Sequence, residues 1–556
     1  MLMLNSSLPG IADRAVREFH ELIELGLING EGEFVSTCQY PPMLRLPPAA
    51  GEDLFKGYVF PKDGLFAIYA HLPFCIKQCS FCHVPNVISS SESEKDLYLE
   101  HIEKEMGICF KRLGAGRLKA NSILLGGGSP TFLTPAQLER FLKSFTARVE
   151  VAGPAQFSCD IEPLTVIGYE GRERLKILKS FNVTRLSLGA QNFSDDMLRK
   201  MNRHHNSADT LRAIGQVKEL GFELEIELIY GWPGETEEQW AETVSQALSC
   251  GADEITIYRL MLIPNEGRKG AITGMLNKRG GLLKANERVI RLKAIGSAML
   301  RAAGYGETLT RTFSRSPDCF SRYRDDFGGC RRDSLSFGYY ALSMLPDRSI
   351  QNTPDLKEYY GAIRDNRLPV RTGLIHNRSR QLVRNLVMPL KNRDLSKKQY
   401  LDRTGVHAGE VFGKQIALLK KYGLLEETAE TLKPTEKGRL FIDDATQIFF
   451  QTDYLPFPKA GYKNGTTKSS RNGPPRRGQP LLACAFALFG LQAFRPARLT
   501  SLRLGSKSTG QISSYLRDTT LGAQEDQRHA RKDYESACYF VRIKCCPTTF
   551  YCGKNF

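Results

Sequence analysis

Three cysteines lie close together in the sequence YAHLPFCIKQCSFC, which covers residues 69–82. They are Cys75, Cys79 and Cys82, separated by three and then two residues. Three thiolates from one short loop can hold three irons of a 4Fe–4S cubane and leave the fourth iron without a protein ligand. That open iron can chelate the amino and carboxylate groups of S-adenosylmethionine (SAM), and an electron delivered through the cluster then releases a 5′-deoxyadenosyl radical. The spacing therefore predicts a 4Fe–4S cluster and SAM as cofactors.

Zinc is the main alternative ligand for these cysteines, with His83 as the fourth residue of a Cys3His site. Zinc sites usually take their ligands from two separated segments of the chain. Here all three thiols come from one loop of eight residues, 75–82. This difference favours the iron–sulfur cluster.

A glycine run follows in LLGGGSPTFLTP, residues 124–135. Glycine lets the backbone approach a ligand closely, so Gly127, Gly128 and Ser129 are candidates to bind the SAM amino group. The lysine of a phosphate-binding P-loop is absent. A tight turn between a strand and a helix remains the alternative, since such a turn needs no ligand.

Polar residues recur where the next predicted strands end. Asp160 and Glu162 end the third strand, Gln191 ends the fourth, and Glu227 lies on the fifth. Each alone could be a hydrogen-bonded residue of a barrel interior, but together they suit a ligand with an ammonium, a carboxylate and a ribose. Arg203 is the expected partner of that carboxylate through two parallel hydrogen bonds, with an exposed helix arginine as the alternative.

These residues fall on an alternating series of strands and helices. The predicted strands are FAIYAHL (66–72), SILLGG (122–127), QFSCDIE (156–162), TRLSLGAQ (184–191), ELEIELIYG (223–231) and EITIYRLMLI (254–263). Helix-like segments with Ser or Thr at their starts lie between them. Such alternation predicts an α/β fold with a parallel sheet, either a full or partial barrel or a doubly wound sheet. In each case ligands bind beyond the carboxyl ends of the strands.

Four regions are expected along the chain. Residues 1–66 form a lead-in with a helix over 11–27, and residues 67–369 form the barrel. Residues 370–458 contain helices and a short alternating pair, LLEETAETLKPT, which predicts a smaller winged-helix-like module. Acids are mixed with its bases, so DNA binding is not expected. Residues 459–556 form a basic, poorly patterned tail.

Charge and composition exclude several classes of protein. The tail holds 17 Lys and Arg but only 5 Asp and Glu, so +12 of the net charge of +17 lies there and the body is only mildly basic. Nucleic acid is therefore not an expected partner. The sequence has no apolar run of about 18 residues, so no membrane span is predicted. The acids that follow the first residues argue against a secretory or transit signal, so a cytosolic location without disulfides is expected.

Together the motifs resemble the oxygen-independent coproporphyrinogen III oxidase (HemN-like) family of radical SAM proteins. The resemblance includes YAHLPFCIKQCSFC, GGGSPTFL, CDIEP, RLSLGAQNFSDDMLRKMNR, IELIYGWPGETEEQW and SLSFGYYALSML, in order through most of residues 67–450. It implies a partial (β/α)6 radical SAM barrel with an accessory C-terminal domain. It also implies Cys75, Cys79 and Cys82 as cluster ligands.

The same resemblance implies which residues contact the cofactors. Tyr69 and Phe81 would flank the cluster and SAM, and the other implied SAM contacts are Gly127, Gly128, Ser129, Asp160, Gln191, Arg203, Glu227 and Met261. Ser129 stands where the family more usually has Thr, Asp160 where it has Glu, and Glu227 where it has Asp. Met261 stands where a small residue lines the site.

One departure concerns the substrate. The oxidases carry a fourth cysteine two residues after the last cluster cysteine, where this sequence has Val84. Relatives with the plainer motif include radical SAM methyltransferases, cyclopropanases and heme chaperones, for which His83, His204 and His205 are candidate axial ligands. The expected partners are a porphyrinogen or other aromatic small molecule and a reductase or flavodoxin-type electron donor.

Overall fold

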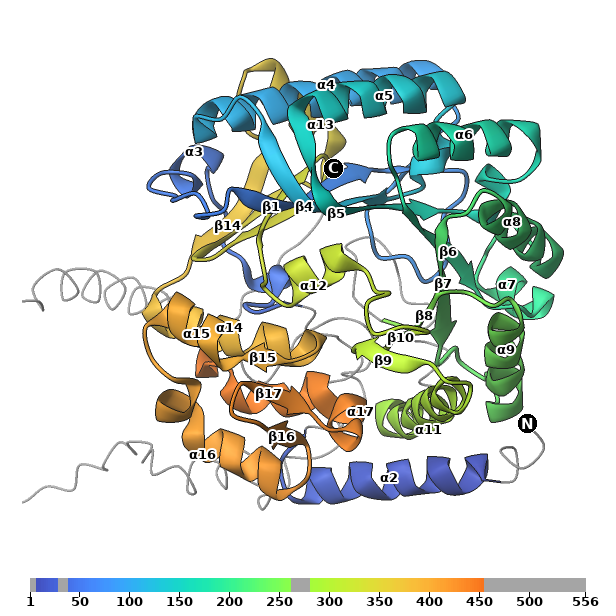
Figure 1. The fold of residues 1–556 in the computed structure, drawn as a ribbon, viewed down its shortest axis with the longest axis vertical. Coiled ribbons are helices and arrows are strands. Elements are labelled where there is room, and N and C mark those ends of the chain that lie inside the picture. The colour runs from blue at the N-terminus through green and yellow to red at the C-terminus, as the bar shows by residue number, and fades with distance from the viewer. Residues whose placement is uncertain (1–6, 29–38, 262–280, 455–556) are drawn as a thin grey trace, which may run out of the picture. The chain divides into compact units, whose positions relative to one another are not determined.

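A computed structural model describes residues 7–28, 39–261 and 281–454 of the chain. Six strands pair side by side in parallel and form the wall of a barrel (Figure 1). They are β1 (Leu65–Leu72), β4 (Leu118–Gly127), β5 (Val149–Ile161), β6 (Arg185–Gln191), β7 (Glu223–Tyr230) and β8 (Glu254–Arg259). These are the six strands that the sequence pattern predicts.

The barrel does not close on itself. The outer edge of β1 pairs with β11 (Asp333–Phe337) and the outer edge of β8 pairs with β10 (Thr312–Ser314), so β1 and β8 do not meet. The remaining strands of this 12-stranded sheet are β12 (Leu342–Leu345), β13 (Arg348–Asn352), β14 (Val370–Ile375) and β9 (Gly306–Leu309). The expected partial barrel is confirmed and the doubly wound alternative is wrong.

Helices cover the outside of the strands (Figure 1). They are α4 (Glu92–Leu113), α5 (Pro135–Arg148), α6 (Gly168–Ser180), α7 (Asp195–Lys200), α8 (Ser207–Glu219), α9 (Glu237–Ser249) and α11 (Gly281–Ala302). Ser or Thr caps the first turn of α4, α5, α7 and α9, as expected. In α5 the Thr134 hydroxyl accepts from the Gln137 amide N–H, and the Gln137 side chain accepts from the Thr134 N–H. Reciprocal bonds of this kind satisfy amide groups that the helix leaves unpaired.

The strands separate an apolar outer face from a polar inner face. On β7, Leu224, Ile226 and Leu228 are fully buried in the core, whereas Glu223, Glu225 and Glu227 alternate with them. Successive side chains of a strand point to opposite faces, so the acids share the face turned away from the helices. The polar groups of the barrel therefore gather inside it.

The C-terminal module has the element order of a winged helix. Its elements are α14 (Arg378–Asn392), β15 (Leu395–Ser396), α15 (Lys397–Thr404), α16 (Ala408–Lys421), β16 (Leu425–Glu427), β17 (Thr431–Pro434) and α17 (Glu436–Ala445). The predicted alternating pair is the antiparallel pair β16–β17. The predicted module therefore contains the expected helices and strand pair.

The lead-in helix is α2 (Leu8–Glu24), three residues earlier than the predicted 11–27. It lies along α11, and its Phe19 stacks on Phe441 of α17, so it joins the barrel to the C-terminal module (Figure 1). The predicted domain boundaries stay predictions. The C-terminal module was predicted to begin at residue 370, and β14, which begins there, belongs to the large sheet. The predicted tail, 459–556, lies outside the described residues.

Two further expectations concern the described part of the chain. None of its helices combines the length and the apolar content that crossing a bilayer requires. Its eight cysteines are all free thiols.

Candidate active site

The cysteine loop begins directly after β1. A short parallel pair, β2 (Phe74–Cys75) with β3 (Val87–Ile88), closes the loop at its base. Cys79 is buried, and Cys75 and Cys82 are half-buried. Burial, with the charges of Cys82 and Cys79, raises the pKa of Cys75 to about 12. A cationic metal between the three neighbouring thiols would favour their thiolate forms, and three thiol donors in one loop fit an iron–sulfur cluster.

The segment after α7 holds the cysteine loop in place. The Asn202 side chain donates to the carbonyl of Gln78 at 2.7 Å. The backbone N–H of Ser80 donates to the carbonyl of Met201 at 3.0 Å, and its hydroxyl donates to the carbonyl of Lys200 at 3.2 Å. The end of β1 and the turn after β6 therefore form one structure.

Arg203 links this structure to the end of β5. Its Nη1 lies 3.2 Å from Cys79 Sγ, and its Nη2 donates to the carbonyl of Gly189 at 2.9 Å and lies 3.4 Å from Glu162 Oε1. Its Nε is buried and has no hydrogen-bond partner among the described residues. The sequence placed Arg203 at a SAM carboxylate, and the free Nε is compatible with that prediction.

Glu162 accepts contacts from three nitrogen-bearing side chains. His204 Nε2 and His205 Nδ1 each lie 3.1 Å from its carboxylate, in addition to Arg203. Burial alone would raise the pKa of Glu162, but the hydrogen bonds with His204 and His205 and the charge of Arg203 outweigh it and lower the pKa to about 2. Glu162 is thus a fully ionised carboxylate that orients Arg203.

The two histidines bear on the heme-ligand hypothesis. The side chain of His205 is buried, its Nδ1 contacts Glu162, and its Nε2 lies 3.3 Å from the carbonyl of Ala190. Both ring nitrogens are therefore engaged within the protein. This arrangement does not favour His205 as an axial ligand of heme.

The glycine run at the end of β4 packs against the cysteine loop. Gly127 has a φ of +109°, and a Cβ there would lie 2.7 Å from the ring of His71. A Cβ on Gly128 would lie 2.6 Å from the backbone of Pro73 and Phe74. Close packing alone accounts for both glycines, and the predicted SAM contact of Gly127, Gly128 and Ser129 stays a prediction.

Gln191 ends β6 with a φ of +67° and is buried. Positive φ is uncommon outside glycine, and such residues concentrate at functional sites. The side-chain amide turns back over Gly189, where a Cβ would lie 2.7 Å from Gln191 Nε2. Gln191 and Arg203 thus meet at Gly189.

Asp160 and Glu227 lie inside the barrel, near Tyr69 and Tyr258. Tyr258 donates to Glu227 Oε1 at 3.2 Å, and Tyr69 lies 3.1 Å from His71 Nδ1. Although protein surrounds these four residues, each retains accessible surface and is not fully packed. Burial and the charges of Glu227 and Glu225 raise the pKa of Asp160, and burial and the charge of Glu225 raise that of Glu227 to about 7.

Deeper in the barrel lies a charged cluster that the sequence did not predict. Arg185 Nη2 lies 2.5 Å from Glu225 and 2.8 Å from Glu254, and Arg324 Nη1 lies 3.1 Å from Glu225. Arg324 belongs to α12 (Arg322–Gly328), which follows β10. The alternating acids of ELEIELIY were the available signal, but their arginine partners come from distant segments.

Phe81 and Met261 lie beside an apolar cluster near the cysteine loop. Phe81 packs against the cluster formed by Met197, Met201, Ile229, Trp232 and Leu260. Met261 follows β8 and is half-buried, and it is the last described residue before 281. The structure therefore places all thirteen predicted site residues at or inside the carboxyl end of the barrel.

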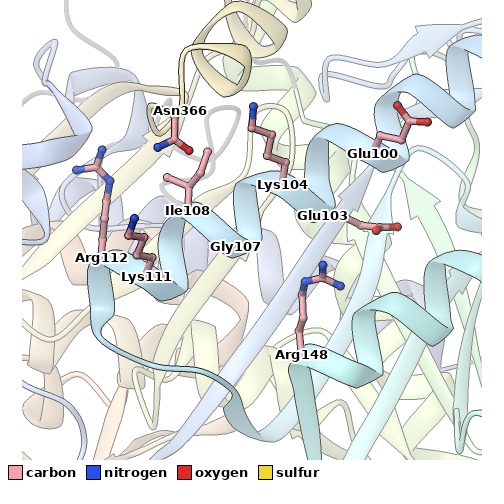
Figure 2. Close-up of a pocket in the computed structure, with 9 residues that line it drawn as sticks. All are labelled: Glu100, Glu103, Lys104, Gly107, Ile108, Lys111, Arg112, Arg148 and Asn366. Carbon is pink, nitrogen blue, oxygen red and sulfur yellow. The ribbon is translucent and has the colours of Figure 1, made fainter.

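A groove elsewhere on the surface contains none of these residues. Figure 2 shows the residues that line the groove, which come mainly from the outer face of α4. The groove has a volume of about 720 Å³. Arg148, which lines it, directly precedes β5, so the groove lies toward the amino ends of the strands. Its Lys and Arg side chains are mixed with Glu100 and Glu103, and it is not the predicted site.

Comparisons with known proteins agree with the sequence motifs. The model of the Radical SAM superfamily matches residues 69–247, and that of the HemN C-terminal domain matches residues 381–441. The chain is 26% identical over 427 residues to the oxygen-independent coproporphyrinogen III oxidase of Escherichia coli, covering 74% of this chain and 91% of that relative. It is 26% identical over 384 residues to the heme chaperone HemW of Bacillus subtilis, covering 68% and 98%.

A solved structure shows the same fold. The structure of coproporphyrinogen III oxidase (HemN) from Escherichia coli, described as a radical SAM enzyme, matches with a TM-score of 0.61 at 23% identity. The match covers 74% of this chain and 96% of that one. It therefore extends over most of this chain.

Proposed function

Because this chain is a radical SAM protein with a HemN C-terminal domain, and so uses a 4Fe–4S cluster and SAM, we propose that it is an enzyme acting on a tetrapyrrole. The proposed reaction is an oxidative decarboxylation like that named for the oxidase relatives. The observation that carries the proposal is the convergence of the three cysteines, Arg203, Gln191 and Asp160 at one end of the barrel.

The three thiols of the cysteine loop are proposed to hold the cluster. Cys75, Cys79 and Cys82 are its ligands in this proposal, and the fourth iron is left for SAM. When bound, these cofactors supply a 5′-deoxyadenosyl radical, which can take a hydrogen atom from the β-carbon of a propionate side chain. Loss of CO₂ from the resulting substrate radical, with its remaining electron passed to a one-electron acceptor, would then leave a vinyl group.

Arg203 and Gln191 are proposed to bind the amino-acid end of SAM. The Nε of Arg203 is a buried donor without a partner among the described residues, which favours a ligand carboxylate beside it. Glu162 keeps the guanidinium oriented, because it is ionised and lies 3.4 Å from Nη2. A buried charged donor fixed in this way binds a carboxylate without reorganising.

Asp160 and Glu227 are proposed to face the cationic part of SAM. Both carboxyl groups have raised pKa values, since burial and neighbouring acids disfavour their charge. A sulfonium or ammonium beside them would favour the ionised forms and be attracted in return. Tyr69 and Phe81 provide aromatic surface nearby, and the cluster around Trp232 excludes water from the loop side.

A second group of functions is favoured by Val84, which stands where the oxidases have a further cysteine. The similarity to the heme chaperone HemW, equal in identity to that of the oxidase, points the same way. The candidates are radical methyl or methylene transfer and heme delivery. A flavodoxin-type electron donor and a cytosolic location belong to the proposal as well.

The test is an anaerobic assay of the reconstituted, reduced protein with SAM. 5′-Deoxyadenosine and porphyrin products are measured with and without coproporphyrinogen III. Substrate-dependent 5′-deoxyadenosine together with a vinyl product supports the oxidase, whereas a mass gain of one CH₂ unit supports the methyl transfer. Tight heme binding without turnover contradicts both enzymes and supports the chaperone.

A further inference from the structure

Each of the three cysteine sulfurs lies near a side-chain N–H group. Asn86 Nδ2 is 3.7 Å from Cys75 Sγ and 4.0 Å from Cys82 Sγ. Arg203 Nη1 is 3.2 Å from Cys79 Sγ. Two side chains therefore supply one donor to every thiol of the loop.

The orientation of Asn86 supports donation to sulfur. Its Oδ1 is buried without a hydrogen-bond partner among the described residues, so only the NH₂ end of the amide has contacts. If the amide were reversed, its oxygen would face two thiolates and repel them. An amide held with its acceptor unsatisfied indicates that the contact at its donor end determines its position.

The backbone keeps Asn86 at this place. The next residue, Val87, pairs with Phe74 in the β2–β3 pair, and its N–H donates to the carbonyl of Pro73 at 2.8 Å. Asn86 is thus fixed at the base of the cysteine loop, one residue before the strand that closes it. Arg203 is fixed independently by Gly189 and Glu162.

We propose that Asn86 and Arg203 set the reduction potential of the cluster by donating N–H···S hydrogen bonds to its three thiolate ligands. The proposal rests on the cluster placement given under Proposed function. Reduction adds an electron to the cluster and its thiolates, so nearby N–H dipoles and the guanidinium stabilise the reduced form more than the oxidised form. Asn86 acts through the sulfurs and is a positioning residue rather than a catalytic one.

Asn86 is the residue to test, because Arg203 also faces the proposed SAM site. Asn86→Ala removes both N–H donors, and Asn86→Asp replaces them with an acceptor of the same shape. Asn202→Gly is the matched control, since the Asn202 amide also supports the cysteine loop but donates to the Gln78 carbonyl and not to a sulfur. Asn202 has a φ of +58°, which glycine adopts without strain.

The measurements are iron per chain and the midpoint potential from an anaerobic redox titration followed by EPR. We expect both Asn86 variants to keep the cluster and to titrate at more negative potentials, with Asn86→Asp shifted further. At a fixed potential the ratio of reduced to oxidised cluster should fall about tenfold in Asn86→Ala, equivalent to about 59 mV for one electron. Asn202→Gly should have the same midpoint potential as the unsubstituted protein.

Unchanged potentials in cluster-bearing Asn86 variants would overturn the proposal. If those variants lose iron, the unsubstituted protein decides, because N–H···S bonds shift the Fe–S stretching frequencies in resonance Raman spectra between H₂O and D₂O. Absence of that isotope shift would overturn the proposal too. An unsubstituted protein without iron would instead contradict the cluster assignment itself, so the two failures are distinguishable.

Discussion

Two buried groups of charges occupy different depths of the barrel and have opposite balances. The mouth network, at the carboxyl ends of the strands, consists of Glu162, Arg203, His204 and His205. The interior network lies deeper and consists of Asp160, Glu225, Glu227, Glu254, Arg185 and Arg324. In the mouth one carboxylate serves three nitrogen-bearing side chains, whereas in the interior four acids share two arginines.

The pKa values show what this difference does. In the mouth, hydrogen bonds and the charge of Arg203 overcome burial and lower the pKa of Glu162 to about 2. In the interior, burial dominates at two acids and raises the pKa of Glu254 to about 8 and that of Glu227 to about 7. Glu225 is the exception, because the charges of Arg185 and Arg324 outweigh its burial and lower its pKa to about 2. The mouth network is therefore a fixed arrangement of charges in which one donor, Arg203 Nε, has no hydrogen-bond partner among the described residues. In the interior network, Glu254 and Glu227 keep protons near neutral pH that a bound cation would displace.

The comparison suggests a division of roles. A fixed carboxylate–arginine pair suits orientation of a ligand carboxylate, because its geometry does not depend on pH near neutrality. An acid-rich interior whose carboxyl groups have raised pKa values suits a cationic ligand, because a nearby positive charge favours their ionised forms. SAM carries both kinds of group, which is why the two networks at successive depths favour the proposed binding mode.

The largest expected effect is at the mouth itself. Replacing Cys75, Cys79 and Cys82 together by Ser should abolish iron binding and 5′-deoxyadenosine formation, because the thiolate ligands are gone. Cys250→Ser is the control, since Cys250 ends α9 away from the loop. Iron analysis and the SAM cleavage assay are the measurements. Iron retained by the triple variant would show that the mouth is not the cofactor site.

The second-largest effect is expected from a substitution in the interior network. Arg185→Met leaves the buried acids Glu225 and Glu254 without their shared partner, so it should reduce the free energy of unfolding by about 3–5 kcal/mol. Chemical denaturation of the cofactor-free protein measures this. Arg172→Met is the control, because Arg172 pairs with Glu219 at the surface, and no measurable change is expected there. Equal effects of the two changes would mean that the interior network is not tightly coupled.

A smaller effect is expected on the pH dependence of stability, which should differ between the two networks. Glu227 has a folded pKa of about 7 against an ordinary value of 4.5, so the folded state binds its proton more tightly than the unfolded state. Stability from this group is therefore present below pH 4.5 and is lost as the pH rises to about 7. Glu227→Gln should be more stable than the unsubstituted cofactor-free protein at pH 8, by about 3 kcal/mol, with the difference vanishing near pH 4.

Glu162→Gln should behave in the opposite way. The folded pKa of Glu162 is about 2, below its ordinary value of 4.5, so its stabilisation is present above pH 4.5 and is lost as the pH falls toward 2. The variant should be less stable than the unsubstituted protein at pH 7. Thermal unfolding over a pH series measures both variants, and parallel curves for the two would contradict the contrast between mouth and interior.

The smallest expected effect concerns how the mouth binds SAM. Arg203→Lys cannot keep the contacts with Cys79, Gly189 and Glu162 while also presenting a donor at the Nε position. SAM affinity should fall about tenfold, or about 1.4 kcal/mol. Equilibrium dialysis with the cluster-loaded protein measures it, and Arg199→Lys on the exposed face of α7 is the control. Unchanged affinity in Arg203→Lys would remove Arg203 from the proposed SAM site.

Several features of the site were predictable because they depend on short segments. The three cysteines lie in one loop, so their spacing alone restricts the metal they can hold. The alternation of strands and helices predicted a parallel sheet. It followed that the polar residues at the strand ends would meet at one edge. Whether the sheet closed could not be predicted, because closure depends on β11 and β10, which follow the six parallel strands.

The sequence by itself determined where the cysteine loop lies and the order of the elements, because local spacing and hydrophobic periodicity carry that information. The tertiary structure alone decided the partners of the charged groups. Glu162 meets Arg203 across 41 residues, Arg185 meets Glu254 across 69, and the Arg203 guanidinium reaches Cys79 across 124. Charge balance in a buried site depends on which distant strands become neighbours, and only folding brings those side chains within the few ångströms over which they change each other's pKa.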